Sequence, residues 1–165
     1  MSATNPQRHT MDLIALGECL VEFTRREDGS WRAGFAGDAV NVLVHAARLG
    51  RRCGFISSIG NDLFRSLIDM SLVREGIDMS HVRRDDERRN GLYFIENDPH
   101  GESTFHFWRD GSAATRTLVD GNLESISLYA STGQFLFVSG VTLAVIRDID
   151  RIVELLAAVT RTGTR

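Results

Sequence analysis

The sequence predicts an α/β fold built on a parallel sheet, and three observations lead to this prediction. Apolar stretches typical of strands alternate along the chain with stretches whose apolar residues recur at helical spacing. Several strand-like stretches are continuously apolar, as in strands buried on both faces of a sheet. Glycine or an aspartate that can cap a helix separates these strands from the helices that follow. Such alternation favours helices packed on parallel strands through right-handed crossovers.

The first residues of the chain, 1–10, are polar and are expected to form a loose tail. Residues 13–23 (LIALGECLVEF) then predict a strand with a break at Gly17. Residues 25–34 are polar and contain the pair Asp28-Gly29, which is typical of a turn.

Residues 35–50 (FAGDAVNVLVHAARLG) predict a turn that leads into an apolar helix ending at Gly50, with Asp38 as the helix cap. A glycine such as Gly37 lets the backbone approach a ligand closely, and a helix N-terminus presents unpaired N–H groups to ligand oxygens. Asn41 lies one turn into this helix, where its amide is able to reach the same ligand. Gly37 and Asn41 are therefore candidate binding residues; an ordinary strand-to-helix turn is the alternative.

The next segments predict a buried strand over 53–59 and a helix from Asp62 to Glu75. Residues 82–90 (VRRDDERRN) are a run of mixed charges, expected to form a solvated turn. The residues of the helix expected to face the core are Leu63, Leu67, Met70 and Val73.

Two short β-type stretches, 91–96 and 103–108, are joined by turn residues and predict a hairpin that stands off the main layer as a lid. The alternation then resumes with a short helix over 120–128, an apolar strand over 135–139 and a helix over 148–160. The expected core face of the last helix is Ile149, Ile152, Val153, Leu155, Leu156 and Val159.

Composition narrows the function classes. The chain has 165 residues, enough for one domain or part of a larger one, and all 19 basic residues are Arg. The absence of Lys excludes a Schiff-base or P-loop lysine within this sequence. A net charge of −3 gives no reason to expect nucleic acid or an anionic membrane as a partner.

Cysteine and histidine usage points to a reducing compartment and to no metal site. Cys19 and Cys53 lie in apolar segments and are expected to be buried free thiols, as in the cytosol. The five histidines are scattered, so no metal ligands are predicted. With neither a signal-peptide core nor an apolar run of membrane-spanning length, we predict a cytoplasmic protein without a membrane partner.

Several motifs, in the same order, resemble a known family. Residues 36–41 (AGDAVN) and 47–50 (ARLG) resemble the first signature of the ribokinase-like (PfkB) sugar kinases. The resemblance extends over about residues 11–165. Residues 54–56, 59–62 and 73–78 also resemble the family. Four stretches resemble its 2-keto-3-deoxygluconate kinases in particular: 17–22 (GECLVE), 91–96 (GLYFIE), 105–109 (FHFWR) and 138–144 (VSGVTLA).

The resemblance implies a ribokinase-like three-layer α/β core with a small β lid, truncated after the N-terminal half. The expected division places 11–24, 35–78 and 112–165 in the core, and 25–34 and 79–111 in the lid. In this family the catalytic aspartate, within a Gly-Ala-Gly-Asp turn, and the ATP site lie in the second half. We therefore expect no catalytic, cofactor-binding or metal-binding residue in this chain.

The resemblance also implies a substrate site. Gly37 and Asn41 would contact sugar hydroxyls, and Tyr93 would touch a sugar acid from the lid. Phe107 and Arg109 occupy the family's aromatic and arginine positions on the lid. Arg109 has independent support, because a planar guanidinium pairs bidentately with a carboxylate; a surface ion pair or stacking on an aromatic ring is its alternative role.

The implied function is transfer of the γ-phosphate of ATP, with Mg²⁺, to 2-keto-3-deoxygluconate or a related sugar. Two alternatives remain open: a non-catalytic module that binds sugar acids, and one half of a split kinase that pairs with a separate C-terminal chain. A homodimer through the lid is a further expectation from relatives. A dinucleotide-dependent oxidoreductase is disfavoured, because no GxGxxG motif follows the first strand.

Overall fold

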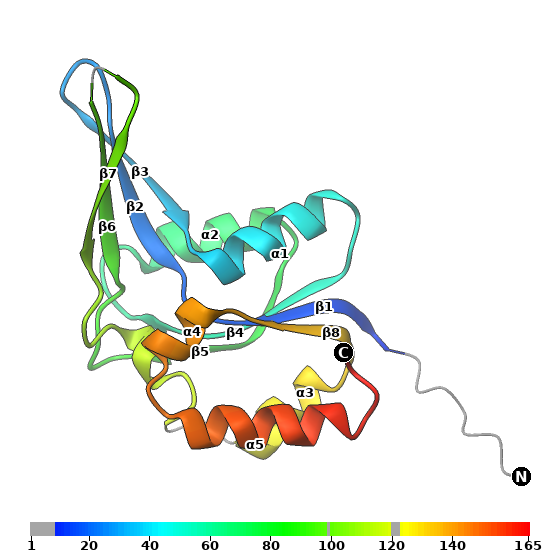
Figure 1. Cartoon of the computed structure of the whole chain (residues 1–165). Coiled ribbons are helices and arrows are strands. Elements are labelled where there is room, and N and C mark those ends of the chain that lie inside the picture. Colours follow the sequence, from blue (N-terminus) through cyan, green and yellow to red (C-terminus); the bar gives the residue numbers. More distant parts are fainter. Residues whose placement is uncertain (1–8, 99, 120–122) are drawn as a thin grey trace, which may run out of the picture.

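The computed structural model describes residues 9–98, 100–119 and 123–165. Most of the expected tail and the first residues of the helix predicted over 120–128 lie outside the described residues. Two four-stranded sheets organise the described part of the chain: one forms the core, and the other stands off it (Figure 1).

The core sheet is parallel, as predicted, with the strand order β5-β4-β1-β8. The central strand β1 (Met11–Leu16) pairs with β4 (Cys53–Gly60) on one side and with β8 (Gly133–Val138) on the other, so that Leu13 lies opposite both Cys53 and Phe135. β5 (Asp78–Asp85) completes the sheet beside β4. Every residue of β4 is buried, which explains its apolar sequence.

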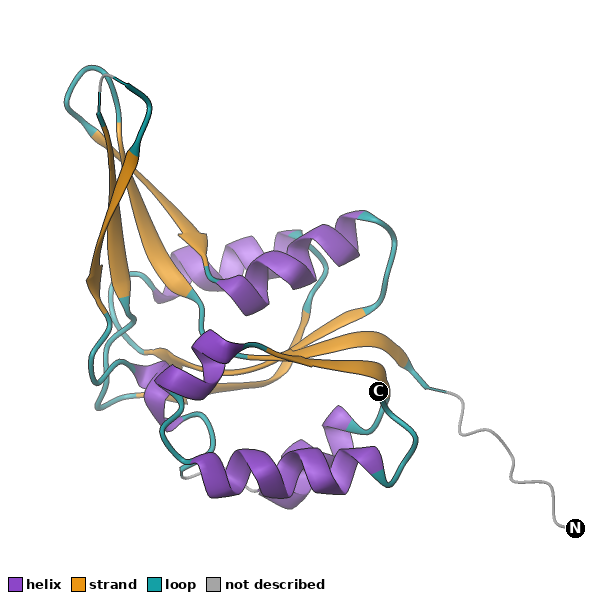
Figure 2. Ribbon diagram, viewed as in Figure 1, coloured by secondary structure: helices purple, strands orange, loops and turns teal. Residues whose placement is uncertain are grey.

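Helices cover both faces of this sheet and make three layers (Figure 2). α1 (Asp38–Arg48) and α2 (Arg65–Arg74) lie on one face, and α3 (Leu123–Ala130) and α5 (Ile149–Thr160) lie on the other. Side chains alternate between the two faces of a strand. Ala15 therefore belongs to the apolar cluster between the sheet and α1, whereas Ile14 belongs to the cluster between the sheet and α5. The predicted three-layer α/β architecture is confirmed.

The short helices η1 (Ala113–Arg116) and α4 (Gly140–Val145) complete the described elements. Cys19 and Cys53 are buried free thiols, as expected. Within the described ranges, no helix is both long and apolar enough to cross a membrane.

The second sheet, which we call the lid, has the order β3-β2-β6-β7. β2 (Leu20–Arg25) pairs with β3 (Trp31–Ala36) and with β6 (Leu92–Asn97), and β6 forms an antiparallel hairpin with β7 (Ser103–Trp108). The hairpin therefore forms where the sequence predicts it. β7 is one of the two edge strands of the lid, and we call it the outer strand. Every one of its residues is exposed.

The strand predicted over 13–23 is two strands in two sheets. The chain leaves the core at Gly17, where an added Cβ would lie 2.4 Å from the Cβ of Ala39. Residues 20–24, which the predicted division places in the core, belong to β2 of the lid. The lack of a side chain at Gly17 thus leaves room for α1 to pack against the chain where it passes from one sheet to the other.

The charge run over 82–90 also differs from its predicted solvated turn. Its first part completes β5, so these residues lie in the core sheet and not in the lid. Asp85 is buried, accepts hydrogen bonds from the backbone N–H groups of Glu87 and Arg88 at 2.9 and 3.0 Å, and pairs with Arg83 at 2.8 Å. These partners offset the cost of burying its charge. Within the run, residues 86–89 are exposed, whereas Asn90 is buried again.

Two predicted helix faces are partly wrong. In the second helix, Leu63, Met70 and Val73 are exposed, and the buried residues are Ile68 and Leu72. In α5, Ile152, Leu155 and Val159 are buried as predicted, whereas the other predicted core residues of that helix are exposed. Both helices carry more apolar residues than one face holds, and packing on the sheet selects one stripe. The three wrongly assigned residues of α5 are Ile149, Val153 and Leu156.

Candidate functional site

A cavity of about 290 Å³ lies between the lid and the start of α1, at the carboxyl end of β1. Ligands of parallel α/β sheets bind at this end of the strands. All the binding residues expected from the sequence line this one cavity, although they come from segments far apart in the chain. Its lining includes the predicted Gly37, Asn41, Tyr93, Phe107 and Arg109, together with Glu18, Leu20, Asp38, Phe105 and Val141.

Gly37 forms the floor of the cavity. Its φ of +154° and ψ of +151° belong to a region that only glycine adopts readily, and an added Cβ would lie 2.6 Å from the carbonyl oxygen of Glu18. The backbone can pass this close to Glu18 because no side chain intervenes. Gly37 is also the N-cap of α1, and its carbonyl accepts the N–H of Asn41 at 2.8 Å.

Asp38 is the first residue of α1 and not its cap, which corrects the prediction. One of its carboxylate oxygens accepts the N–H of Ala39 at 2.7 Å. Its other oxygen, Oδ2, is buried and has no hydrogen-bond partner among the described residues. A carboxylate at a helix N-terminus is favourable, because it faces the positive end of the helix dipole.

Aromatic rings form the wall on the lid side. Tyr93 on β6 lies opposite Phe107 on β7, and the two rings stack with their centroids 5.5 Å apart. Phe105 continues this row and, like Phe107, is about half exposed. The hydroxyl of Tyr93 donates to a carboxylate oxygen of Glu22, and burial together with this bond raises the pKa of Tyr93. Tyr93 therefore stays protonated, with its proton held by Glu22.

Arg109 directly follows β7 and connects the lid with the core. Its guanidinium carbon lies 4.8 Å from the ring centroid of Phe107. Its Nη1 donates to Oε1 of Glu18 at 2.6 Å. Arg109 thus forms an ion pair with Glu18 and stacks on the ring of Phe107, the two alternative roles considered above. It also lines the cavity.

Glu18 is the site residue that the sequence reasoning did not select. It is only 2% exposed, and its Oε2 has no hydrogen-bond partner among the described residues. Burial raises the pKa of Glu18 and the charge of Asp38 adds to this, whereas Arg109 opposes it. An available signal was its position two residues after a buried strand, because a charged residue there lies at the ligand-binding edge of a parallel sheet.

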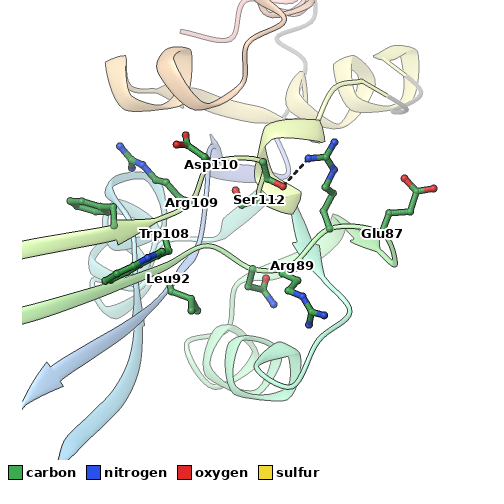
Figure 3. A pocket seen from close by; sticks show the side chains of 11 residues that line it. Glu87, Arg89, Leu92, Trp108, Arg109, Asp110 and Ser112 are labelled. Carbon is green, nitrogen blue, oxygen red and sulfur yellow. Dashed lines mark hydrogen bonds between the residues drawn. The ribbon is translucent and has the colours of Figure 1, made fainter.

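A second cavity, of about 500 Å³, lies at the base of the lid (Figure 3). Leu92 and Trp108 line it from the face of the lid sheet opposite Tyr93, because side chains alternate along a strand. In Figure 3 the side chains of Arg89 and Arg109 point in different directions. The arrangement therefore offers no convergent set of donors for one anion.

Within the ranges that the structure covers, no three His, Cys, Asp or Glu side chains lie close enough to share a metal ion.

Comparison with known proteins connects this geometry to a family. Residues 10–164 match the family described as pfkB family carbohydrate kinase. The chain belongs to the pfkB carbohydrate kinase family. The family expected from the motifs is thereby confirmed.

Individual pfkB relatives agree with this assignment. A 2-dehydro-3-deoxygluconokinase of Dickeya dadantii is 30% identical over 146 residues, which cover 86% of this chain and 47% of the relative. A fructokinase of Salmonella typhimurium is 33% identical over 129 residues, covering 78% of this chain and 40% of the relative. The chain thus spans about half the length of these relatives.

Solved structures show the same fold. A PfkB family carbohydrate kinase of Listeria grayi superposes with a TM-score of 0.82 at 19% identity, covering 93% of this chain and 50% of the other. A PfkB protein of Polaromonas superposes with a TM-score of 0.81 at 23% identity, covering 93% of this chain and 53% of the other. The ribokinase-like fold is therefore confirmed for the half that this chain represents.

Proposed function

We propose that this chain is the sugar-binding half of an ATP-dependent sugar-acid kinase, with 2-keto-3-deoxygluconate or a related sugar acid as the phosphoryl acceptor. One observation carries the proposal: a single cavity brings the N-terminus of α1 together with the aromatic rings and Arg109 of the lid. The name 2-dehydro-3-deoxygluconokinase among the pfkB relatives supports the choice of a sugar acid over a neutral sugar.

Each part of the cavity has a role in this proposal. The amide of Asn41 and the backbone at Gly37 bind sugar hydroxyls, because both present polar groups at a helix start. The stacked rings of Tyr93 and Phe107 cover the apolar face of the sugar and exclude water. Arg109 uses one nitrogen on Glu18, and its remaining N–H donors pair with the carboxylate of the ligand.

Holding the acceptor in a fixed orientation is a substantial part of catalysis, because it replaces a bimolecular encounter. In the complete reaction a base would accept the hydroxyl proton, bound ATP would supply the phosphoryl group, and Mg²⁺ would neutralise the developing charge. We assign to this chain the binding and positioning of the acceptor, because the polar and aromatic side chains that do this in the proposal all line one cavity.

The test replaces Arg109 and measures binding of 2-keto-3-deoxygluconate to the purified chain by calorimetry. Arg109→Met should weaken binding by roughly 10- to 100-fold, the effect of losing a charge-assisted hydrogen bond. Arg109→Lys should recover part of the affinity, since it restores the charge without the planar fork. Arg89→Met, an exposed arginine outside this cavity, is the matched control. Wild-type affinity in Arg109→Met would contradict the proposal.

A split kinase is the second candidate, and the outer edge of β8 shows where a further part of the kinase can join the sheet. The N–H of Arg165 donates to the carbonyl of Gln134 at 3.1 Å, and the N–H of Leu136 donates to the carbonyl of Arg165 at 2.8 Å. This is the bonding pattern of a parallel strand added beside β8. We propose that the catalytic half of the kinase continues the sheet from this edge, within the same polypeptide or as a separate one.

The mass of the protein made from its native gene separates these two arrangements. An intact mass equal to that of the printed sequence, with co-purification of a second chain carrying a Gly-Ala-Gly-Asp turn, supports a split kinase. A mass about twice as large supports a single polypeptide. The printed mass without any such partner contradicts both, and leaves a binding module without catalysis.

A further inference from the structure

The buried carboxylate of Glu18 lies in the proposed substrate cavity, yet sugar-acid binding by Arg109 gives it no role. Glu18 is only 2% exposed. Its Oε1 accepts the hydrogen bond from Nη1 of Arg109 at 2.6 Å, and its Oε2 is buried without a partner among the described residues. A buried charge with an unsatisfied oxygen is unfavourable, so this group needs an explanation.

Charged and titratable groups approach Glu18 from several elements. Arg109 reaches it from the end of β7, and Asp38 faces it from the first turn of α1. Tyr93 lines the same cavity from β6, and its hydroxyl is bonded to Glu22 of β2. Cys19 follows Glu18 in the chain, and burial raises the pKa of its thiol, which stays neutral. From α4 the lining residue is the apolar Val141.

These groups leave the cavity with an excess of negative charge. Glu18 and Asp38 are two carboxylates, and the guanidinium of Arg109 is the cation that lines the same cavity. Asp38 also has a buried oxygen, Oδ2, without a partner in the described part of the chain. A sugar acid adds a third carboxylate, and like charges in a poorly hydrated site repel strongly.

We propose that the Glu18–Asp38 carboxylate pair takes up one proton when a carboxylate ligand binds to Arg109, with Glu18 acting as the positioning residue of that arginine. The inference rests on the proposed binding of a sugar acid. The proton comes from the buffer and forms an O–H bond at Oε2 of Glu18, while Oε1 keeps its hydrogen bond to Arg109. The formal charge of the cavity is then the same with the ligand as without it.

The direction of proton transfer agrees with the surroundings of Glu18. Burial and the charge of Asp38 both raise the pKa of Glu18, and Arg109 is the group that opposes them. When Arg109 shares its charge with a ligand carboxylate, its ability to keep Glu18 ionised decreases. The pKa of Glu18 is therefore higher in the complex than in the free chain, which is the condition for proton uptake.

Calorimetry on the full chain measures this uptake directly. Binding of 2-keto-3-deoxygluconate is followed from pH 5 to 8, at each pH in two buffers with different ionisation enthalpies. We expect an uptake approaching one proton per ligand. As the pH rises, the affinity for the sugar acid should fall by up to about 10-fold per pH unit. This holds over the pH range in which Glu18 is ionised in the free chain and protonated in the complex. If Glu18 had only a structural role, no proton would be taken up, and the measured binding enthalpy would be the same in the two buffers.

Two variants locate the proton. Glu18→Gln keeps an acceptor for Arg109 but does not titrate, so it should abolish the uptake and make affinity independent of pH. If Glu18→Gln fails to fold by circular dichroism, Asp38→Asn carries the test, because removing the like charge should reduce the uptake. His106→Gln is the control: it removes another titratable group, from the lid face opposite the cavity, and should leave the uptake unchanged.

The outcomes separate this inference from the proposed function. Binding of the sugar acid without proton uptake, or uptake that persists in Glu18→Gln, overturns the inference and leaves the proposed function standing. If Glu18→Gln does not fold, an undiminished uptake in Asp38→Asn has the same meaning. A chain that is folded by circular dichroism and binds no sugar acid at any pH in the range overturns both.

Discussion

At the scale of the residue, Gly37 and Glu18 show how closely the backbone and the site are connected. The bend at Gly37 brings the start of α1 against the carbonyl of Glu18, while the side chain of Glu18 holds Arg109. One residue therefore acts through its lack of a side chain, and the other through a buried charge. Glu18 lies where the chain passes from β1 of the core to β2 of the lid, and Gly37 lies where β3 of the lid passes into α1.

A substitution of Gly37 should damage stability and binding together. In Gly37→Ala the new Cβ meets the carbonyl of Glu18 and the φ of +154° becomes strained. We expect a loss of about 1–3 kcal/mol of unfolding free energy from the backbone strain alone. Urea denaturation measures this loss. Gly50→Ala is the control, because its φ of +78° is strained but its surroundings are open, and its cost should be about 1 kcal/mol. Equal costs for the two would contradict the close approach at Gly37.

At the scale of the element, the junction between lid and core depends on Asn90. This residue precedes β6, and its side chain bonds both main-chain groups of Gly60 at the end of β4, at 2.9 and 3.0 Å. It also donates to Asp62 at 2.7 Å. Gly60 needs to be glycine here, since an added Cβ would lie 2.6 Å from the backbone of the same loop. A buried amide thus anchors the lid to the core, in addition to the ion pair of Arg109 with Glu18.

Removing this amide should destabilise the chain. Asn90→Ala leaves the buried N–H and C=O of Gly60 without that partner, and each unsatisfied group costs about 1–3 kcal/mol. We expect a loss of about 2 kcal/mol or more by urea denaturation. Asn97→Ala removes the same side chain at the exposed far end of β6, and should cost no more than about 0.5 kcal/mol. A similar loss in both variants would contradict the anchoring role of Asn90.

At the scale of the whole molecule, the two sheets differ in burial. The core sheet is covered by helices on both faces, whereas the outer strand of the lid is exposed along its whole length (Figure 2). Local opening of a protein follows such differences, because few buried contacts hold an exposed strand. A homodimer through the exposed lid, expected from the family resemblance, stays a proposal.

Hydrogen exchange should reproduce this difference. Amides of β1 and β4, in the middle of the core sheet, should exchange only through global unfolding. Amides of β7 should exchange faster by orders of magnitude, and a sugar acid should slow them if the lid closes over it. Mass spectrometry of peptides from the exchanged chain measures both. Uniform protection of the two sheets would contradict this view of the lid.

The sequence by itself determined the features that depend on neighbouring residues: the strand–helix alternation, the turn before α1, the hairpin and the motifs of the pfkB family. It also selected five residues that prove to line one cavity. Tertiary structure decided that β2 joins the lid and β5 the core, and that Ile68 and Leu72 form the buried stripe of α2. It also paired Glu18 with Arg109 across 91 residues of sequence. Local patterns report hydrophobicity and backbone preference, whereas such pairings depend on which distant segment supplies the partner.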